Sequence, residues 1–276
     1  MLTIFLAGVV TSSAYYVNVF DEPFANLDNW YMETMNGDQT GNHEWEFYTN
    51  RPTNVFIRKD NGNSLVLRAV AEEYQGYHFT SGRVHSQKSF GPYGFFNINA
   101  KVPKGNALWP AIWLLPTYSS PYGNWAACGE IDIMETICTE NDAYSTLHFG
   151  QPWPKNVQYP YAPNNRYPTW VDWNQPHWFG VDWQPDFITF YIDAQMINGE
   201  ISGGTLINRI SSNNWWSANA EGQSYGQGAP YNQPFNIILN LAVGGDWPCS
   251  VSGCCNSAAV PAELEIFKVQ VWEKSQ

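Results

Sequence analysis

Hydrophobic positions along this chain recur in short runs, and a helical repeat of apolar residues is almost absent. Clusters of Gly, Pro, Asn and Asp separate the runs, as expected for strands that are joined by turns. The pattern predicts strands at Asn54–Arg58, Ser64–Ala69, Phe79–Ser86, Phe95–Val102, Ala107–Leu114, Gly129–Thr136, Trp178–Asp182, Ile188–Ile192, Phe235–Ala242 and Leu264–Trp272. This spacing predicts an all-β fold in which two antiparallel sheets pack into a β-sandwich.

The ends of the chain and the long gaps between the runs complete this picture. Residues 1–14 form a short apolar run ending in Ser12-Ser13-Ala14, which fits a signal peptide with a small-residue cleavage site. We therefore expect a secreted protein with a single domain over residues 15–276. No apolar run is long enough to cross a bilayer, so no membrane partner is expected. Gln151–Gln175 and Ile201–Gln233 are predicted as long connections, which are usually functional rims or lids.

The composition narrows the class of partner. The chain has 14 Trp and 16 Tyr, more than a core requires, and the flat faces of these side chains suit stacking on sugar rings. A net charge of −12 argues against nucleic acid, anionic membranes and a highly sulfated substrate. A neutral partner is therefore expected, although part of the aromatic surplus belongs to the core.

The cysteines point to disulfides rather than to a metal. None has a zinc-binding spacing or a histidine partner, and the cysteines of an exported protein normally form disulfides. The odd number leaves at least one free or intermolecular, and the sequence leaves the pairing open. The five are Cys128, Cys138, Cys249, Cys254 and Cys255.

One predicted strand carries three acidic residues, Glu130, Asp132 and Glu135. Side chains alternate between the two faces of a strand, so Glu130 and Asp132 share a face while Glu135 points the other way. That arrangement would bury Glu135 beside Ile131 and Ile133, which is costly for a lone carboxylate. A β-bulge near Ile133 and Met134 restores the parity and places all three acids on one face.

Three adjacent carboxylates repel each other, so at least one should have a raised pKa. This suits acid–base chemistry, because retaining glycosidases pair a nucleophilic carboxylate with an acid/base carboxyl about 5–5.5 Å away. The residues alone leave two other interpretations open, a Ca²⁺ site and a solvated strand face. The apolar neighbours of the acids disfavour solvation, and ligation from one strand disfavours a metal.

Five segments together resemble glycoside hydrolase family 16. The acidic strand reads Glu-Ile-Asp-Ile-Met-Glu, which is similar to the bulged E-x-D-x-x-E signature of laminarinase-like members. The resemblance covers about residues 15–274 and implies a jelly-roll sandwich with a concave sugar cleft and retaining endo-hydrolysis of 1,3-β-glucan. The other matching segments are Tyr48–Val55, Thr80–Val84, Leu108–Pro116 and Phe235–Pro248.

The resemblance also implies roles for single residues. Glu130 corresponds to the nucleophile, Asp132 to a helper and Glu135 to the acid/base. Substrate contacts are implied for Asn50, Arg51, Arg83, Trp109, Trp113, Trp125, His148 and Trp247. Read without the family, Trp113 could equally be a core residue, His148 fits a core histidine better than a cleft residue, and Arg83 could pair with a structural acid.

Two departures from the family pattern matter. Members often bind Ca²⁺ through an N-terminal acid and a C-terminal Asp; Asp21 and Glu22 remain here, but Phe267 replaces that Asp. We therefore expect no cofactor and no metal at the active site; the lost ligand disfavours a structural Ca²⁺ but leaves it open. The usual Pro after the cleft Trp is Ala126, and nearby Cys128 could form a disulfide with the 249–255 loop, tying two cleft walls together.

Three functions compete at this stage. The first is a monomeric, retaining endo-1,3-β-glucanase acting on neutral β-glucan. The second is a non-catalytic β-glucan recognition protein, which the presence of all three acids disfavours. The third keeps the chemistry but changes the polysaccharide to mixed-linkage glucan, agar or carrageenan; the acidic charge disfavours carrageenan.

Overall fold

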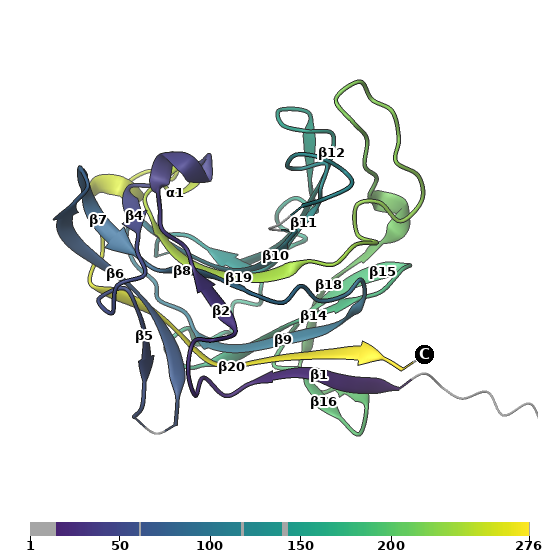
Figure 1. Cartoon of the computed structure of the whole chain (residues 1–276), viewed down its shortest axis with the longest axis horizontal. Helices are drawn as coiled ribbons and strands as arrows, with labels where there is room; N and C mark the ends of the chain where they lie inside the picture. The colour runs from purple at the N-terminus through teal and green to yellow at the C-terminus, as the bar shows by residue number, and fades with distance from the viewer. Residues whose placement is uncertain (1–14, 61, 117–118, 140–142, 276) are drawn as a thin grey trace, which may run out of the picture.

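The alternating runs fold into two large sheets that lie one above the other (Figure 1). The computed structural model describes residues 15–60, 62–116, 119–139 and 143–275, so the predicted signal peptide lies outside the described residues. The all-β sandwich is confirmed, and the pairing is antiparallel except between β4 (Glu46–Tyr48) and β7 (Tyr77–Ser81).

The sheet that carries the acids has seven strands, in the order β13-β12-β11-β10-β19-β8-β2. The acidic strand, β11, lies between β10 and β12. The bounds are β2 Trp30–Met32, β8 Arg83–Ser86, β10 Leu108–Leu115, β11 Glu130–Thr136, β12 Ala143–Gly150, β13 Asn156–Tyr159 and β19 Asn236–Val243.

The second sheet has eleven strands and backs the first. Besides β4 and β7 it contains β1 Tyr16–Glu22, β3 Met35–Asn36, β5 Val55–Arg58, β6 Ser64–Tyr74, β9 Gly94–Lys101, β14 His177–Trp183, β15 Phe187–Ile192, β18 Thr205–Ser211 and β20 Ala262–Lys274. Elsewhere in the described chain lie the hairpin β16 Gln195–Ile197 and β17 Glu200–Ser202, the helix α1 Asp246–Ser250 and the 3₁₀ turns Gly37–Thr40, Ser212–Asn214 and Cys254–Asn256.

The predicted strand Phe79–Ser86 is wrong as a single element, because Gly82 divides it. β7 ends at Ser81 in the eleven-stranded sheet, and β8 begins at Arg83 in the seven-stranded sheet. A Cβ atom on Gly82 would lie 2.8 Å from the carbonyl oxygen of Asn54, so only glycine lets the chain cross between the sheets here.

The core fills the space between the two sheets with aliphatic and aromatic side chains, as the apolar runs predict. Alternating residues of both sheets are fully buried there, among them Val84, Ile112, Ile131 and Leu239 on one side and Leu67, Ile98, Val181 and Ile266 on the other. The acids lie on the opposite, outer face of the seven-stranded sheet.

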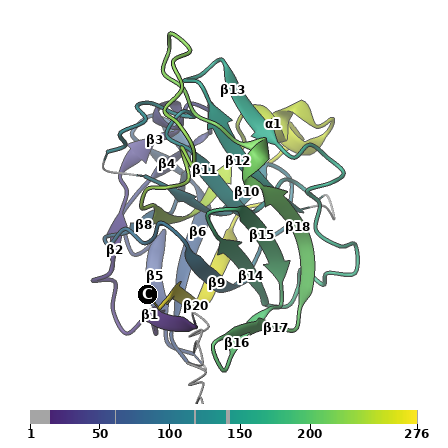
Figure 2. The same cartoon turned by 90° about the vertical axis from the view of Figure 1, so that its right-hand side faces the viewer.

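The long connections are only partly irregular. The prediction that Ile201–Gln233 is one connection is wrong over Thr205–Ser211, where edge strand β18 pairs with β15. Polar residues interrupt the apolar positions of this partly exposed strand, so its sequence gave only a weak signal for a strand. The remainder, residues 212–233, rises beside β12 and β13 in both views (Figures 1 and 2) and is joined to β12 at Gly150 and Ser217.

Candidate active site

The predicted bulge is present in β11. Asp132 pairs with Thr146 and Glu135 pairs with Tyr144, so Ile133 and Met134 together oppose a single residue of β12. Both are fully buried in the core although they are consecutive, which a regular strand does not allow.

The bulge is stabilised from within the core. The buried Tyr167 hydroxyl donates a hydrogen bond to the carbonyl oxygen of Ile133, at 2.7 Å, and so satisfies a group that the bulge removes from the strand ladder. Tyr167 lies in the predicted connection Gln151–Gln175, and no sequence signal linked it to the acids.

Cross-strand pairing shows what shares the outer face with the acids. Directly paired residues of antiparallel strands project from the same side of a sheet. Glu130 pairs with His148, Asp132 pairs with Trp113, and Glu135 pairs with Ala111. The structure therefore brings together on one face the three acids and two of the predicted binding residues.

Each carboxylate has a nitrogen-bearing neighbour. The Trp125 indole N–H donates to Glu130 Oε2 at 2.9 Å, and the Trp109 indole N–H donates to Glu135 Oε1 at 3.1 Å. His148 Nε2 lies 3.1 Å from Asp132 Oδ2 and 3.8 Å from Glu130 Oε1. His148 is therefore a residue of the acidic face rather than a core histidine, and Trp125 packs on its ring at 5.5 Å.

Burial and mutual repulsion raise the pKa of all three acids. For Glu135, burial and then the charge of Asp132 raise the pKa to about 8. Burial likewise raises the pKa of Asp132 to about 8, although its hydrogen bond with Glu130 acts the other way. Burial and the Asp132 charge also raise the pKa of Glu130. Glu130 and Asp132 thus share a proton near neutral pH, and Glu135 holds a second.

An aromatic cluster lies beside Glu135. The Trp247 ring packs edge-on against Trp109 at 5.4 Å and lies 5.6 Å from Tyr144. The segment that carries Trp247 is tied to the residues after β11 by a disulfide between Cys138 and Cys254. Trp109 and Trp247 are thus held together, with Trp109 in contact with Glu135.

The suggested disulfide of Cys128 is wrong. Cys128 is a buried free thiol, whereas Cys249 pairs with Cys255 within the loop and Cys138 pairs with Cys254. The tie between two sides of the site exists, but it starts from the C-terminal end of β11. The sequence could not identify this disulfide, because the two bonded cysteines are 116 residues apart.

Removal of this tie should cost more stability than removal of the second disulfide. The Cys138–Cys254 bond spans 116 residues and the Cys249–Cys255 bond spans 6, so the first restricts the unfolded chain more. The Cys138→Ser/Cys254→Ser variant should lose about 2 kcal/mol more in urea unfolding than the Cys249→Ser/Cys255→Ser variant. Equal losses would show that chain entropy does not govern these bonds.

At the other end of the face, Arg83 pairs with an acid, Glu33, while its contact with substrate stays a prediction from the resemblance. Its Nε lies 3.0 Å from Glu33 Oε2, and its guanidinium lies over the Trp113 ring at 5.0 Å. Trp113 is partly exposed, and its indole N–H donates to Asn240 Oδ1 at 2.8 Å. A hollow beside this group is lined by Tyr31, Glu33, Thr34, Met35, Arg83, His85, Leu115 and Pro116.

Asn50 and Arg51 lie on the turn after β4. Asn50 is exposed, and the Arg51 guanidinium forms an ion pair with Glu72 and lies 4.3 Å from the centre of the Tyr74 ring. These contacts are with β6 rather than with the acids. A sugar contact for Asn50 or Arg51 stays a prediction from the resemblance.

The connection before β19 holds the Trp125 segment in place. Ser217 Oγ donates to the carbonyl oxygen of Ala127 at 2.6 Å, and Gln233 Nε2 donates to that of Cys128 at 2.8 Å. The buried Tyr231 hydroxyl lies 3.2 Å from the Glu130 carbonyl oxygen and 3.0 Å from that of His148. Sequence reasoning missed these supporting residues, since only the length of the connection signalled a function.

The two acids expected from the resemblance to bind Ca²⁺ are already occupied by donors of the protein. Lys268 Nζ and Gln270 Nε2 each donate to Asp21 at 2.7 Å. Buried Glu22 accepts bonds from the Phe24 amide, the Asn29 amide side chain and the Trp30 indole. With Lys268 supplying a positive charge at this position, these residues do not fit a cation site.

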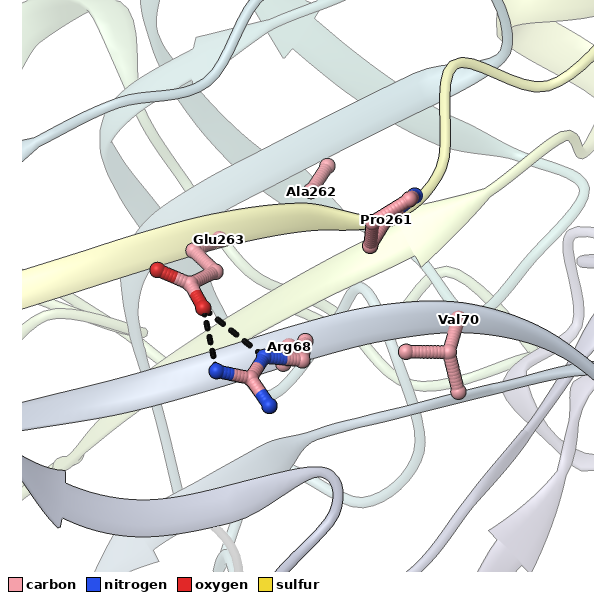
Figure 3. Close-up of a pocket in the computed structure, with 5 residues that line it drawn as sticks. All are labelled: Arg68, Val70, Pro261, Ala262 and Glu263. Atoms are coloured by element: carbon pink, nitrogen blue, oxygen red, sulfur yellow. Dashed lines mark hydrogen bonds and ion pairs between the residues drawn. The ribbon is translucent and has the colours of Figure 1, made fainter.

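Three residues of the acidic face carry metal-ligating atoms, and the other sheet carries a second hollow. Atoms of Glu130, Asp132 and His148 lie within 4.8 Å of one another, but the imidazole and the carboxylates already pair among themselves. Figure 3 shows a hollow on the other sheet, where Arg68 and Glu263 of β6 and β20 form an ion pair with 2.6 Å between Nη2 and Oε1. Its lining offers no second acid, so the outer face of β11 is the candidate active site.

No helix within the described ranges is long and apolar enough to cross a membrane.

Comparison with known proteins agrees with this geometry. The model of glycosyl hydrolases family 16 matches residues 41–248. A glucan endo-1,3-beta-glucosidase of Cryptopygus antarcticus is 33% identical over 89% of this chain and 87% of its own length. Glucan endo-1,3-beta-glucosidase A1 of Niallia circulans is 29% identical over 92% of this chain, which spans 37% of that relative. The catalytic domain of an endo-1,3-beta-glucanase (laminarinase) from Thermotoga petrophila superposes with a TM-score of 0.72 and 28% identity, covering 96% of this chain and all of that domain.

Proposed function

Since the chain belongs to glycosyl hydrolases family 16, we propose that it is a retaining endo-β-glucanase that hydrolyses 1,3-β-glucan. The observation that carries the proposal is the bulge of β11, which places Glu130, Asp132 and Glu135 on one face beside the indoles of Trp125 and Trp109. The relatives that are endo-1,3-β-glucosidases or endo-1,3-β-glucanases support the choice of substrate.

The reaction would proceed by double displacement. Glu135, protonated near neutral pH, donates its proton to the glycosidic oxygen while the Glu130 carboxylate attacks the anomeric carbon. A covalent glycosyl-enzyme forms and the leaving chain departs. Glu135, now ionised, removes a proton from water, which attacks the same carbon and releases Glu130. Asp132 holds the proton that it shares with Glu130, and the Trp125 indole N–H fixes the attacking carboxylate.

The surrounding residues suit a neutral polysaccharide. We assign sugar stacking to Trp109, Trp113, Trp125 and Trp247, and polar contacts to Asn50, Arg51, Arg83 and His148. Trp125 and Trp109 each present an indole that also bonds a catalytic carboxylate, so a stacked sugar would lie against the reacting acids. No cofactor enters the reaction, and we propose that the enzyme works as a secreted monomer. Two disulfides are consistent with an oxidising compartment.

A panel of polysaccharides tests the assignment. Laminarin should release reducing ends with internal cleavage, faster than mixed-linkage glucan, agarose or carrageenan, and NMR should show the β-anomer forming first. Binding of laminarin without any reducing ends would instead identify a recognition protein. Cleavage of agarose alone would keep the mechanism and overturn the substrate.

A further inference from the structure

A second pair of acids lies buried beside the active site. Glu46 is fully buried and Glu44 is 5% exposed, and both belong to the segment at the start of β4. Two neighbouring buried carboxylates cannot both be ionised without a large cost in free energy. The pair therefore requires an explanation, and the reaction described above does not use it.

The hydrogen bonds show where the proton lies. Glu44 accepts from the Tyr48 hydroxyl at 2.9 Å and from Asn42 Nδ2 at 3.2 Å. Glu46 Oε2 accepts from the Val243 amide at 2.8 Å, while no donor in the described part of the chain reaches its buried Oε1. Burial, the charge of Glu44 and a hydrogen bond to Glu44 raise the pKa of Glu46 well above its usual range. Glu46 is thus the partner that holds a proton.

Glu44 is connected to the active site on two sides. A Cβ atom on Gly245 would lie 3.4 Å from Glu44 Cγ and 3.5 Å from the Trp109 ring, so both side chains flank this glycine. Trp109 in turn donates to Glu135. On the other side, Asn240 Nδ2 donates to the Tyr48 hydroxyl at 3.2 Å and its Oδ1 accepts from Trp113.

We propose that Glu44 is a positioning residue whose buried negative charge, made tolerable by the proton on Glu46, keeps Glu135 in its acid form. Charges separated by a few side chains interact more strongly through protein than through water. The charge of Glu44 is one of the causes that raise the pKa of Glu135, after burial and Asp132. The inference rests on the proposed function, since it concerns the acid/base of that reaction.

Glutamine substitutions separate charge from structure. Glu46→Gln imitates the protonated acid: its carbonyl can accept from Val243 and its amide can donate to Glu44. The pH profile of kcat/KM on laminarin should therefore keep its basic limb. The double variant Glu44→Gln/Glu46→Gln removes the charge, and its basic limb should move to lower pH by about 0.5 unit or more. The single variant Glu44→Gln should shift the basic limb in the same direction, because burial keeps Glu46 protonated in it.

The comparison has clear opposite outcomes. The inference would be overturned if the double variant and Glu46→Gln had the same basic limb, whether that limb is unchanged in both or shifted in both. Wild-type hydrolysis of laminarin in the same assay tests the proposed function independently, so the two failures are distinct. The single Glu44→Gln variant keeps the test open if the double variant is unstable. Other charged groups around Glu44 and Glu135 are unchanged in every variant: Arg83, Glu130, Asp132, His148, and the His43–Asp246 ion pair.

Discussion

Replacement of Glu130 by alanine should lower kcat on laminarin by about 10⁴-fold or more, because the reaction then lacks the carboxylate that forms the covalent intermediate. The Trp125 and His148 contacts to this carboxylate show that it is held in one position. Reducing-end assays measure the loss, and thermal unfolding should show that the fold is retained. Normal turnover by this variant would exclude Glu130 as the nucleophile.

A small anion should restore the reaction in a way that identifies the missing group. The space left by the Glu130 carboxylate lies on the side from which it attacks, so azide entering there should form an α-glycosyl azide from an aryl β-glucoside substrate. Glu73→Gln is a suitable control, because its carboxylate is exposed and pairs only with His78 among the contacts described for it. This control should keep wild-type activity.

Replacement of Glu135 by glutamine should lower kcat on laminarin by about 10²–10⁴-fold, the usual contribution of a general acid. The pKa of about 8 that burial and Asp132 give this carboxyl keeps it protonated at neutral pH. An aryl substrate with a good leaving group needs no proton, so its first step should stay fast and the intermediate should accumulate as a burst. An equal loss on both substrates would argue against the acid role.

The pH profile of the wild-type enzyme gives a second view of the same residue. The reaction needs Glu135 protonated in the free enzyme, so kcat/KM should fall as the pH rises through about 8. On laminarin, the residual kcat/KM of the Glu135→Gln variant should lack this basic limb, because its amide does not titrate. Azide should rescue Glu135→Ala through the opposite side of the sugar and give a β-glycosyl azide.

Much of the site could be predicted from the sequence. The alternation rule placed Glu135 on the wrong face unless the strand contained a bulge near Ile133 and Met134, and that bulge is present. Strand parity is local, so a single segment contains the information. The strand predicted at Gly129–Thr136 could be recognised for the same reason, because its pattern depends on residues that are neighbours in the chain.

Contacts between distant segments could not be predicted in this way. Tyr167 and Tyr231 satisfy carbonyl groups around β11 from loops whose sequence shows only aromatic and polar residues. The pairing of Cys138 with Cys254 joins residues 116 positions apart, so no local pattern reveals it. The disulfide suggested for Cys128 was wrong, because Cys128 is a free thiol. Glu44 also gave no signal, because an acid before β4 is unremarkable until Gly245 and Trp109 pack against it.

The sequence by itself therefore determined which face of their strand the three acids share, because side-chain alternation follows from backbone geometry alone. The tertiary structure decided their protonation. The raised pKa values of Glu130, Asp132 and Glu135 come from burial and from neighbours on other strands and loops. Desolvation and charge interactions act through space, so only the packed sandwich fixes which carboxyl holds a proton.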